Sequence, residues 1–489
     1  MKLLFCIHLP LLPLEALRPS WSSRGAYAVA HGGKVIVASG DAISSGVRVG
    51  MRSGGVSAIA PDTALLEKCA IKEQQALDAI AMALLQYTPE VAFADDFSIV
   101  MDVTASLRLF GGIRALCRRI AKSIASLGFT AQIGAGPTAM GTWILARASR
   151  SPAQTLRRRV LTIQSLARRL DRLPCALLPQ TAPFGEWLRG LDAVDFGAIR
   201  RLPRPGLMRR TNKNLIEALD LAYGSTAEMF EWIKIPSVFS AHVDTFDRIE
   251  DADALVCGAT ALILQMTGWL VAQQLAVTSF TLQLEHERGR TAMPPTPLVI
   301  ALAEPTWKEP HLLRLLKEHL AKVELLAPVI GLRLETGQLV PMVPPTDSLF
   351  PDPGGSPADF NRLLELLTAR LGVENVLAPS SVHDYRPEVA NAWVPATKKN
   401  SRNDEQGKAV KRPFWILPKP IALLLRDHRP FYGSPLTFIE GPERIEAGWW
   451  SDKAAARDYF TAQASDGSCY WIYLERCQEA RWFLHGLYG

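Results

Sequence analysis

The chain has 489 residues, too many for one compact core, and its length predicts three to five domains. With 48% hydrophobic and 21% charged residues, the composition is that of a globular protein and excludes a disordered chain. The formal net charge of +6 is only mildly basic, so the places where arginines cluster are more informative than the total.

The first apolar run, Leu3 to Leu14, is broken by Pro10 and Pro13 and is followed by no small-residue cleavage site. We therefore expect a buried strand over Leu3 to His8 and not a signal peptide. A lone histidine at a strand end is usually satisfied by a backbone carbonyl, and we expect this of His8. The seven cysteines are scattered, without a C-x-x-C pair, which indicates reduced thiols in a cytoplasmic protein. No segment is expected to be long and apolar enough to cross a membrane.

The next elements follow from apolar spacing and from turn residues. Val35 to Met51 predicts a strand, a small-residue turn and a short helix. Residues 62–88 predict one long helix, ended by Pro89. Ser98 to Thr104, rich in Ile, Val and Met, predicts a buried strand, and a basic amphipathic helix begins after Gly112. Residues 131–147 predict a strand, a glycine-rich turn and a helix.

The strand at 98–104 resembles the palm motif of Y-family (translesion) DNA polymerases, Ser-Ile-Asp-Glu-Ala-Tyr-Leu-Asp, which carries two metal-binding carboxylates. When Asp102 is aligned with the last Asp, Phe97 and Ser98 occupy the positions of the acidic pair. In the first strand, Ile7 and Leu9 occupy the positions of the family's two aspartates.

The segment after Val35 is similar to the family's fingers motif, in which a Tyr and an Arg grip the triphosphate. Gly40 replaces that Tyr and Ile43 replaces that Arg. The family's metal and phosphate ligands are thus absent at the aligned positions while the apolar frame is retained. A register slip of one or two residues would bring Asp95 or Asp96 into the metal site, but a slip of one turns each side chain to the other face of the sheet.

The loss of these groups, with Arg108-Leu-Phe-Gly-Gly112 and Gly136-Pro-Thr138, is similar to the ImuB group, the non-catalytic Y-family paralogues of bacterial mutagenesis cassettes. The resemblance implies an α/β multidomain right-hand fold with no catalytic residue, metal or cofactor. It implies a ferredoxin-like palm (1–9 and 66–165), small fingers (10–65), a helix-hairpin-helix-like thumb (166–235), a βαββαβ little finger (238–342), a linker (343–411) and a strand-rich C-terminal partner-binding module (412–489).

Basic residues cluster in the second half of the palm and in the thumb. The simplest interpretation is helices with a solvated basic face, and the functional one is contact with DNA phosphates, which gives affinity without sequence preference. The residues expected to bind DNA are Arg147, Arg150, Arg168, Arg200, Arg201, Arg204, Arg209, Arg210 and Lys213. In the little finger, apolar and polar residues alternate from Phe280 to Glu287, which predicts a half-exposed strand. Its exposed face carries Glu285 and Glu287 and is therefore poorly suited to binding phosphates.

Between the little finger and the C-terminal module, the linker contains Thr346-Asp347-Ser348-Leu349-Phe350, which resembles the Gln-x-x-Leu-Phe motif of sliding-clamp ligands with Thr in place of Gln. Residues 357–372 predict an amphipathic helix. The aromatic-rich tail is similar to the ImuB tail, which in that group recruits ImuA and an error-prone C-family DNA polymerase.

The resulting hypothesis is an inactive polymerase homologue that links the clamp, DNA, ImuA and a C-family polymerase during SOS-type mutagenesis. One alternative is an active translesion polymerase with an altered metal site using Asp95, Asp96 or Asp102. The other is a DNA-binding module alone.

Overall fold

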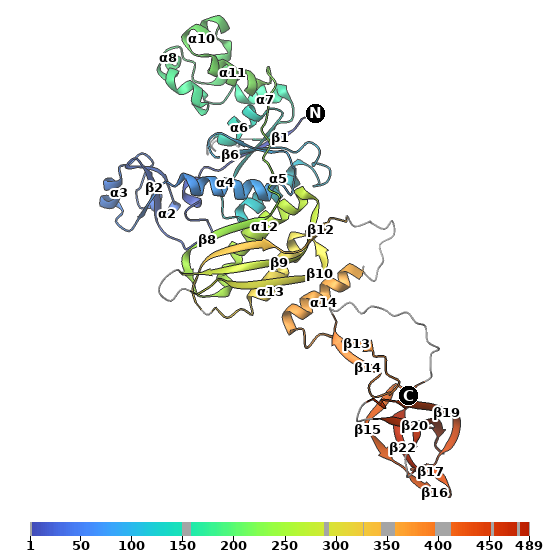
Figure 1. Ribbon diagram of the computed structural model, residues 1–489. Helices are drawn as coiled ribbons and strands as arrows, with labels where there is room; N and C mark the ends of the chain where they lie inside the picture. Colours follow the sequence, from blue (N-terminus) through green and yellow to red (C-terminus); the bar gives the residue numbers. More distant parts are fainter. Residues whose placement is uncertain are drawn as a thin grey trace. The chain divides into compact units, whose positions relative to one another are not determined.

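The computed structural model describes residues 2–148, 158–287, 293–325, 327–343, 357–396, 412–450, 454–476 and 480–488. The chain divides into two compact units, Met1–Arg362 and Leu363–Gly489 (Figure 1). Each is described separately.

A four-stranded antiparallel sheet forms the palm of the first unit, in the order β5 (Val91–Ala94), β6 (Ser98–Asp102), β1 (Leu4–His8) and β7 (Gln132–Gly136). All five residues of β1 are buried. They alternate between two apolar clusters, with Phe5 and Ile7 in one and Leu4 and Cys6 in the other. The central strand is therefore covered on both faces, which is why it reads as a continuous apolar run.

Helices cover the two faces of this sheet. The cluster that contains Ile7 includes residues of α4 (Ala70–Leu84) and α5 (Ile113–Ser126), and the other cluster includes α6 (Ala139–Arg147). Leu116, Ile120 and Ile124, spaced four residues apart along α5, are fully buried. The amphipathic helix predicted after Gly112 is confirmed.

The segment between β1 and α4 holds a small three-stranded sheet in the order β3 (Lys34–Ala38), β2 (Tyr27–His31) and β4 (Ala64–Glu67), together with the short helices α1 (Leu12–Glu15), α2 (Gly40–Ser44) and α3 (Ser53–Ile59). The prediction of one helix over 62–88 is wrong in its first part, because Ala64–Glu67 pairs with β2 in parallel. Helical spacing could not reveal this pairing, since the partner strand lies more than thirty residues away.

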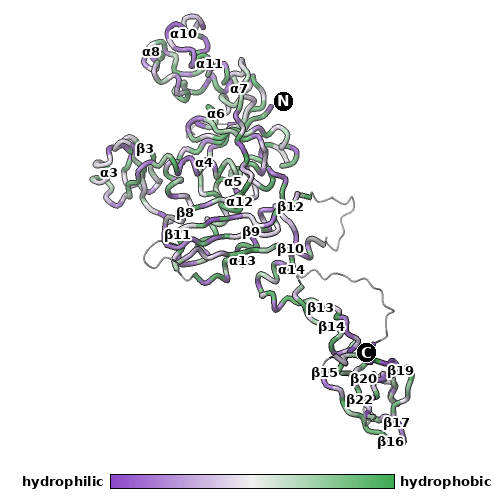
Figure 2. The backbone as a smooth tube through the Cα atoms, viewed as in Figure 1, coloured by the Kyte–Doolittle hydropathy of each residue, from purple (hydrophilic) through white to green (hydrophobic). Residues whose placement is uncertain are grey.

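Residues 163–223 form a helical bundle of α7 (Ile163–Leu170), η1 (Cys175–Leu177), η2 (Pro179–Phe184), α8 (Gly185–Gly190), α9 (Phe196–Arg201), α10 (Arg204–Arg210) and α11 (Lys213–Tyr223). Side-chain caps start three of these helices: Thr162, Asp195 and Asn212 each accept a hydrogen bond from a backbone N–H in the first turn. The arginine-rich end of α10 is purple, the hydrophilic end of the scale, in Figure 2.

The predicted βαββαβ order is confirmed by β8 (Ser240–Ile249), α12 (Val256–Gln273), β9 (Leu275–His286), β10 (Thr296–Thr306), α13 (Glu309–Leu320) and β11 (Val329–Thr336). A single turn, η3 (Ala252–Leu255), precedes α12. The sheet order is β10-β9-β11-β8, and β12 (Leu339–Pro341) pairs with β9.

One helix, Ala252–Gln273, is long and apolar enough to cross a membrane by length and composition, which corrects the expectation that no segment would be. Its apolar window is 72% buried within the fold. It packs against α4 of the palm so closely that a Cβ added at Gly268 would lie 1.9 Å from the carbonyl oxygen of Met82. The sequence of a core helix packed on several sides resembles that of a membrane span because both are apolar all round.

The second unit begins within the predicted amphipathic helix, α14 (Pro357–Leu371), followed by a hairpin of β13 (Leu377–Ser381) and β14 (Asn391–Pro395). Its largest sheet has the order β15 (Trp415–Ala422), β22 (Arg481–Leu487), β21 (Cys469–Glu475), β20 (Ala455–Gln463) and β19 (Thr437–Ala447). A smaller sheet holds β16 (Leu424–Arg426), β17 (Arg429–Tyr432) and β18 (Ser434–Pro435). Tyr459, Trp471 and Tyr473 form part of the buried aromatic core.

Candidate functional site

The ends of β1 and β6 meet where the resemblance places the catalytic carboxylates. Ile7 and Leu9 are fully buried and pack in the cluster beneath α4 and α5. Phe97 packs on the same cluster, with the Lys68 ammonium 5.7 Å from the centre of its ring. Ser98 is fully buried and donates its hydroxyl to the carbonyl oxygen of Asp96 at 3.0 Å. These four positions provide apolar packing and one hydroxyl group.

Ile7, Leu9, Phe97 and Ser98 together form what we call the palm corner. His8 lies beside it and contacts the hairpin between β5 and β6. Its Nδ1 is 2.9 Å from the carbonyl oxygen of Asp96 and 3.2 Å from the hydroxyl of Ser98. Burial lowers the pKa of His8, against the opposing effect of Asp96, and so favours a neutral ring. The expectation that a backbone carbonyl satisfies this histidine is confirmed.

Asp95 and Asp96 lie in the turn between β5 and β6, where Asp96 and Phe97 have φ angles of +53° and +49°. Two side chains of α6 hold this turn. The indole Nε1 of Trp143 donates to the carbonyl oxygen of Asp95 at 3.0 Å, and Arg147 Nε lies 2.7 Å from the Asp96 carboxylate. The guanidinium of Arg147 also lies 4.3 Å from the centre of the Trp143 ring. The charge of Asp96 is therefore balanced by an arginine.

Asp102 lies at the opposite end of the same strand. It pairs with Leu4, whereas Ser98 pairs with His8, so the two ends of β6 are about 13 Å apart at the usual rise of a strand. Its carboxylate accepts hydrogen bonds from the backbone N–H of Thr104 at 3.0 Å and from its hydroxyl at 2.6 Å. Asp102 thus closes a local turn, far from Asp95 and Asp96. Within the described part of the chain, no group of three or more His, Cys, Asp or Glu side chains could hold a metal ion.

The two aligned positions of the fingers lie on α2. Gly40 is the first residue of this helix, which Ser39 caps by accepting a hydrogen bond from the backbone N–H of Ala42. Ile43 is 56% exposed. Neither side chain can donate a hydrogen bond to a phosphate.

Several of the predicted DNA-binding side chains already have partners. Arg147 holds Asp96 as described above and also donates to the carbonyl oxygen of Leu177. The remaining pairs are Arg200 with Asp171 at 3.3 Å, Arg204 with Asp220, and Lys213 with Glu217 at 2.9 Å.

Four other predicted cations are exposed and have no ion-pair or hydrogen-bond partner for their side chains among the described residues: Arg168, Arg201, Arg209 and Arg210. The last three lie on α9 and α10, on either side of the turn at Leu202-Pro203. The structure therefore leaves exposed, uncompensated arginines on two consecutive helices of the bundle. Arg150 lies outside the described residues.

On the little finger, carboxylates compensate the cations of the open sheet face. Glu285 accepts a hydrogen bond from Arg333 Nε at 3.0 Å and lies 3.2 Å from His242 Nε2. Glu287 pairs with Arg248 at 2.8 Å. This compensation is consistent with the expectation that the strand is poorly suited to phosphates.

The clamp-like motif, Thr346, Asp347, Ser348, Leu349 and Phe350, lies outside the described residues. The last described residue before it, Val343, is 77% exposed.

The sequence predicts DNA contact for Arg147, whereas in the structure Arg147 and Trp143 both hold the turn at Asp95 and Asp96. The available signal was their spacing of four residues, which places both side chains on one face of α6. The same reasoning did not foresee that this face would meet the turn at Asp95 and Asp96.

Residues 15–147 match the model of the impB/mucB/samB family. The chain is 24% identical over 476 residues to Protein ImuB of Caulobacter vibrioides, in both strain NA1000 / CB15N and strain ATCC 19089 / CIP 103742 / CB 15, which covers 91% of this chain and 100% of the relative. Among solved structures, it is similar to a ternary complex of Dbh, with 15% identity, a TM-score of 0.39 and coverage of 68% of this chain and 98% of the other. An insertion ternary complex of Dbh DNA polymerase gives 14% identity, a TM-score of 0.39 and coverage of 70% and 100%.

Proposed function

We propose that this chain, an ImuB-like paralogue of the Y-family DNA polymerases, is a non-catalytic adaptor in DNA-damage-induced translesion synthesis in the bacterial cytoplasm. The observation that carries this proposal is the burial of Ile7 and Leu9 where a polymerase needs carboxylates. Phosphoryl transfer by two metal ions requires oxygen ligands that hold the cations against the developing charge. A fully buried isoleucine and leucine cannot hold a divalent cation.

The Arg147–Asp96 pair supports the same proposal. A polymerase of this family would need free carboxylates near the palm hairpin, but the carboxylate of Asp96 lies 2.7 Å from a guanidinium. Asp102 lies at the other end of β6, about 13 Å from this hairpin at the usual rise of a strand. The three aspartates that an altered metal site would use therefore lie at two ends of one strand.

The proposed partners are DNA, the sliding clamp, ImuA and an error-prone C-family DNA polymerase. DNA binding is supported by the uncompensated arginines of α9 and α10, including Arg201, Arg209 and Arg210. Protein partners are supported by large exposed aromatic side chains of the second unit, such as Trp393 at 70%, Phe414 at 95% and Trp449 at 81% exposure. Exposed aromatic side chains are a feature of protein-binding surfaces.

Primer extension with the full chain tests the absence of catalysis. With Mg²⁺ or Mn²⁺, all four deoxynucleoside triphosphates and a primed template, we expect no incorporation above that of the Asp95→Asn, Asp96→Asn and Asp102→Asn variants. Incorporation by the unmodified chain that these substitutions abolish would establish the alternative, an active polymerase with an altered metal site.

Co-purification tests the adaptor role. We expect the sliding clamp to be retained by the full chain and lost from the Leu349→Ala/Phe350→Ala variant, because extended clamp ligands insert such a pair into a preformed pocket. Val343→Ala, a nearby exposed apolar position, serves as the matched control and should retain the clamp. DNA binding without clamp, ImuA or C-family polymerase would support the third candidate, a DNA-binding module alone.

A further inference from the structure

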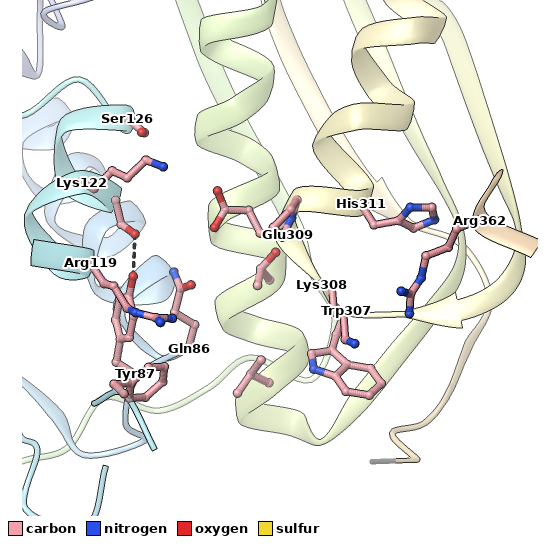
Figure 3. A pocket seen from close by; sticks show the side chains of 15 residues that line it. Gln86, Tyr87, Arg119, Lys122, Ser126, Trp307, Lys308, Glu309, His311 and Arg362 are labelled. Carbon is pink, nitrogen blue, oxygen red and sulfur yellow. Dashed lines mark hydrogen bonds between the residues drawn. The ribbon is translucent and has the colours of Figure 1, made fainter. Parts of the chain in front are cut away.

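A cavity of about 690 Å³ lies away from the palm corner described above. Its walls come from the end of α4 and from α5 on the palm side, and from α12 and the start of α13 on the little-finger side (Figure 3). Its volume is within the range of about 300 to 1,000 Å³ that is usual for small-molecule sites.

The walls of this cavity are strongly cationic. Figure 3 shows Arg119 and Lys122 on one wall and Lys308 and Arg362 on the facing wall, with Glu309 between them. Three of these cations face the carboxylate of Glu309 without an ion pair of their own within the part of the chain that the structure describes. Arg119, Lys122 and Lys308 form no ion pair among the described residues, while Arg362 pairs with Asp359 at 3.2 Å. The uncompensated cations of α5 and of the residue before α13 repel each other, and an anionic ligand would relieve that repulsion.

Two further features of the cavity are the start of a helix and a buried hydroxyl group without a partner. The first residues of α13, Glu309 to His311, line the cavity, so the positive end of this helix lies there. Thr267 of α12 is among the lining residues, is 4% exposed, and its hydroxyl has no hydrogen-bond partner within the described residues. A buried hydroxyl group normally has a partner.

Aromatic side chains complete the lining. The ring of Tyr87 packs edge-on against Phe110 at 5.3 Å, and the hydroxyl of Tyr87 is 2.8 Å from that of Ser123. Trp307 is half-buried on the opposite wall and presents an indole to the cavity (Figure 3). A ring that stacks beside a group of cations matches a ligand that carries both a base and phosphates.

We propose that this palm–little-finger cleft binds a nucleoside di- or triphosphate, with the phosphates between Arg119, Lys122 and Lys308 and the base against Trp307. The cleft is distinct from the corner at Ile7 and Phe97, and either a catalytic or a non-catalytic palm could carry it. Failure of this proposal would therefore leave the adaptor role standing. Because the ligand touches both α5 and α13, its binding would also strengthen the contact between palm and little finger.

Isothermal titration of the full chain with ATP, and separately with inorganic tripolyphosphate, tests the proposal. We expect saturable binding of both, weakened about tenfold or more by Arg119→Ala/Lys122→Ala and by Lys308→Ala on the facing wall. Arg118→Ala is the matched control, because it removes an exposed arginine of α5 that does not line the cavity. Trp307→Ala should weaken ATP about fivefold or more and leave tripolyphosphate unchanged. Glu309→Gln should tighten both.

Thermal unfolding without ligand checks that each variant folds. The proposal is overturned if neither probe binds, or if ATP binds equally well to the Arg119→Ala/Lys122→Ala variant, which would place the nucleotide elsewhere. It is also overturned if a twenty-residue oligothymidylate or an aspartate-rich peptide, and not ATP, shows the sensitivity to these cleft substitutions.

Discussion

Arg147 Nε lies 2.7 Å from the carboxylate of Asp96 and fastens the β5–β6 turn to α6. The side chain of Arg147 is 20% exposed and that of Asp96 is 40% exposed, so the pair is only partly removed from water. Its position matters more than its strength, because it places a fixed positive charge beside the palm corner where the family resemblance would require metal ions.

We expect Arg147→Ala to lower the free energy of unfolding by only about 1 kcal/mol, since ion pairs that remain partly exposed contribute little. The local effect should be larger. Amide hydrogen exchange over Ala94–Ser98 should accelerate, because Arg147 no longer restrains the turn. Lys213→Ala removes a more exposed pair, with Glu217, and is the control. Equal exchange in both variants would contradict a specific role for Arg147.

Restoring a carboxylate at Ile7 should damage the fold. Ile7 is fully buried, so Ile7→Asp loses apolar packing and buries a polar group, which should cost at least about 4 kcal/mol. Ile43→Asp, at a position 56% exposed, should change stability by no more than about 1 kcal/mol. Urea unfolding of the full chain compares the two variants. If Ile7→Asp lowered the free energy of unfolding no more than Ile43→Asp, the palm corner would be accessible to solvent and not part of the apolar core.

The contact between α12 and α4 depends on a glycine. A Cβ at Gly268 would meet the carbonyl oxygen of Met82, which is backbone and cannot move aside alone. We expect Gly268→Ala to separate the helices and to destabilise the first unit by about 1 to 3 kcal/mol. Limited proteolysis should then cut near α12 faster. Gly54→Ala in α3, where the added Cβ meets nothing within 4 Å, should be harmless.

The arginines of α10 should govern DNA affinity. Arg209→Ala/Arg210→Ala should weaken binding to unrelated duplexes alike and reduce the slope of log affinity against log salt by about 2, because two phosphate contacts are lost. Fluorescence anisotropy at several salt concentrations measures this slope. Arg248→Ala removes a cation already paired with Glu287 and should change it little. An unchanged slope in the double variant would exclude α10 from the DNA interface.

In the second unit, burial lowers the pKa of His485 from 6.5 to about 4. The unfolded chain therefore takes up the proton first as the pH falls. Stability from the neutral ring is complete above about pH 6.5 and is lost towards pH 4, by at most about 3 kcal/mol. Unfolding followed by tryptophan fluorescence between these pH values should show this loss. His485→Gln should flatten the profile, whereas Tyr459→Phe, which removes the 2.7 Å bond to His485 Nδ1, should keep it.

The order of the elements followed from local patterns in the chain. The apolar run of β1 predicts a buried strand, the spacing of Leu116, Ile120 and Ile124 predicts α5, and the alternation of residues 280–287 predicts β9. The sequence alone also shows that Ile7 and Leu9 cannot act as carboxylate ligands, because this depends only on residue type.

Contacts between distant segments could not be predicted from such local patterns. The pairing of Asp96 with Arg147, the parallel pairing of β4 with β2, the approach of Gly268 to Met82 and the cations around the palm–little-finger cleft all join residues far apart in the chain. Periodicity reports which face of an element is apolar but does not report which other element covers it. Those partners are set by the packing of the whole unit, and the charges that end up compensated or exposed depend on that packing.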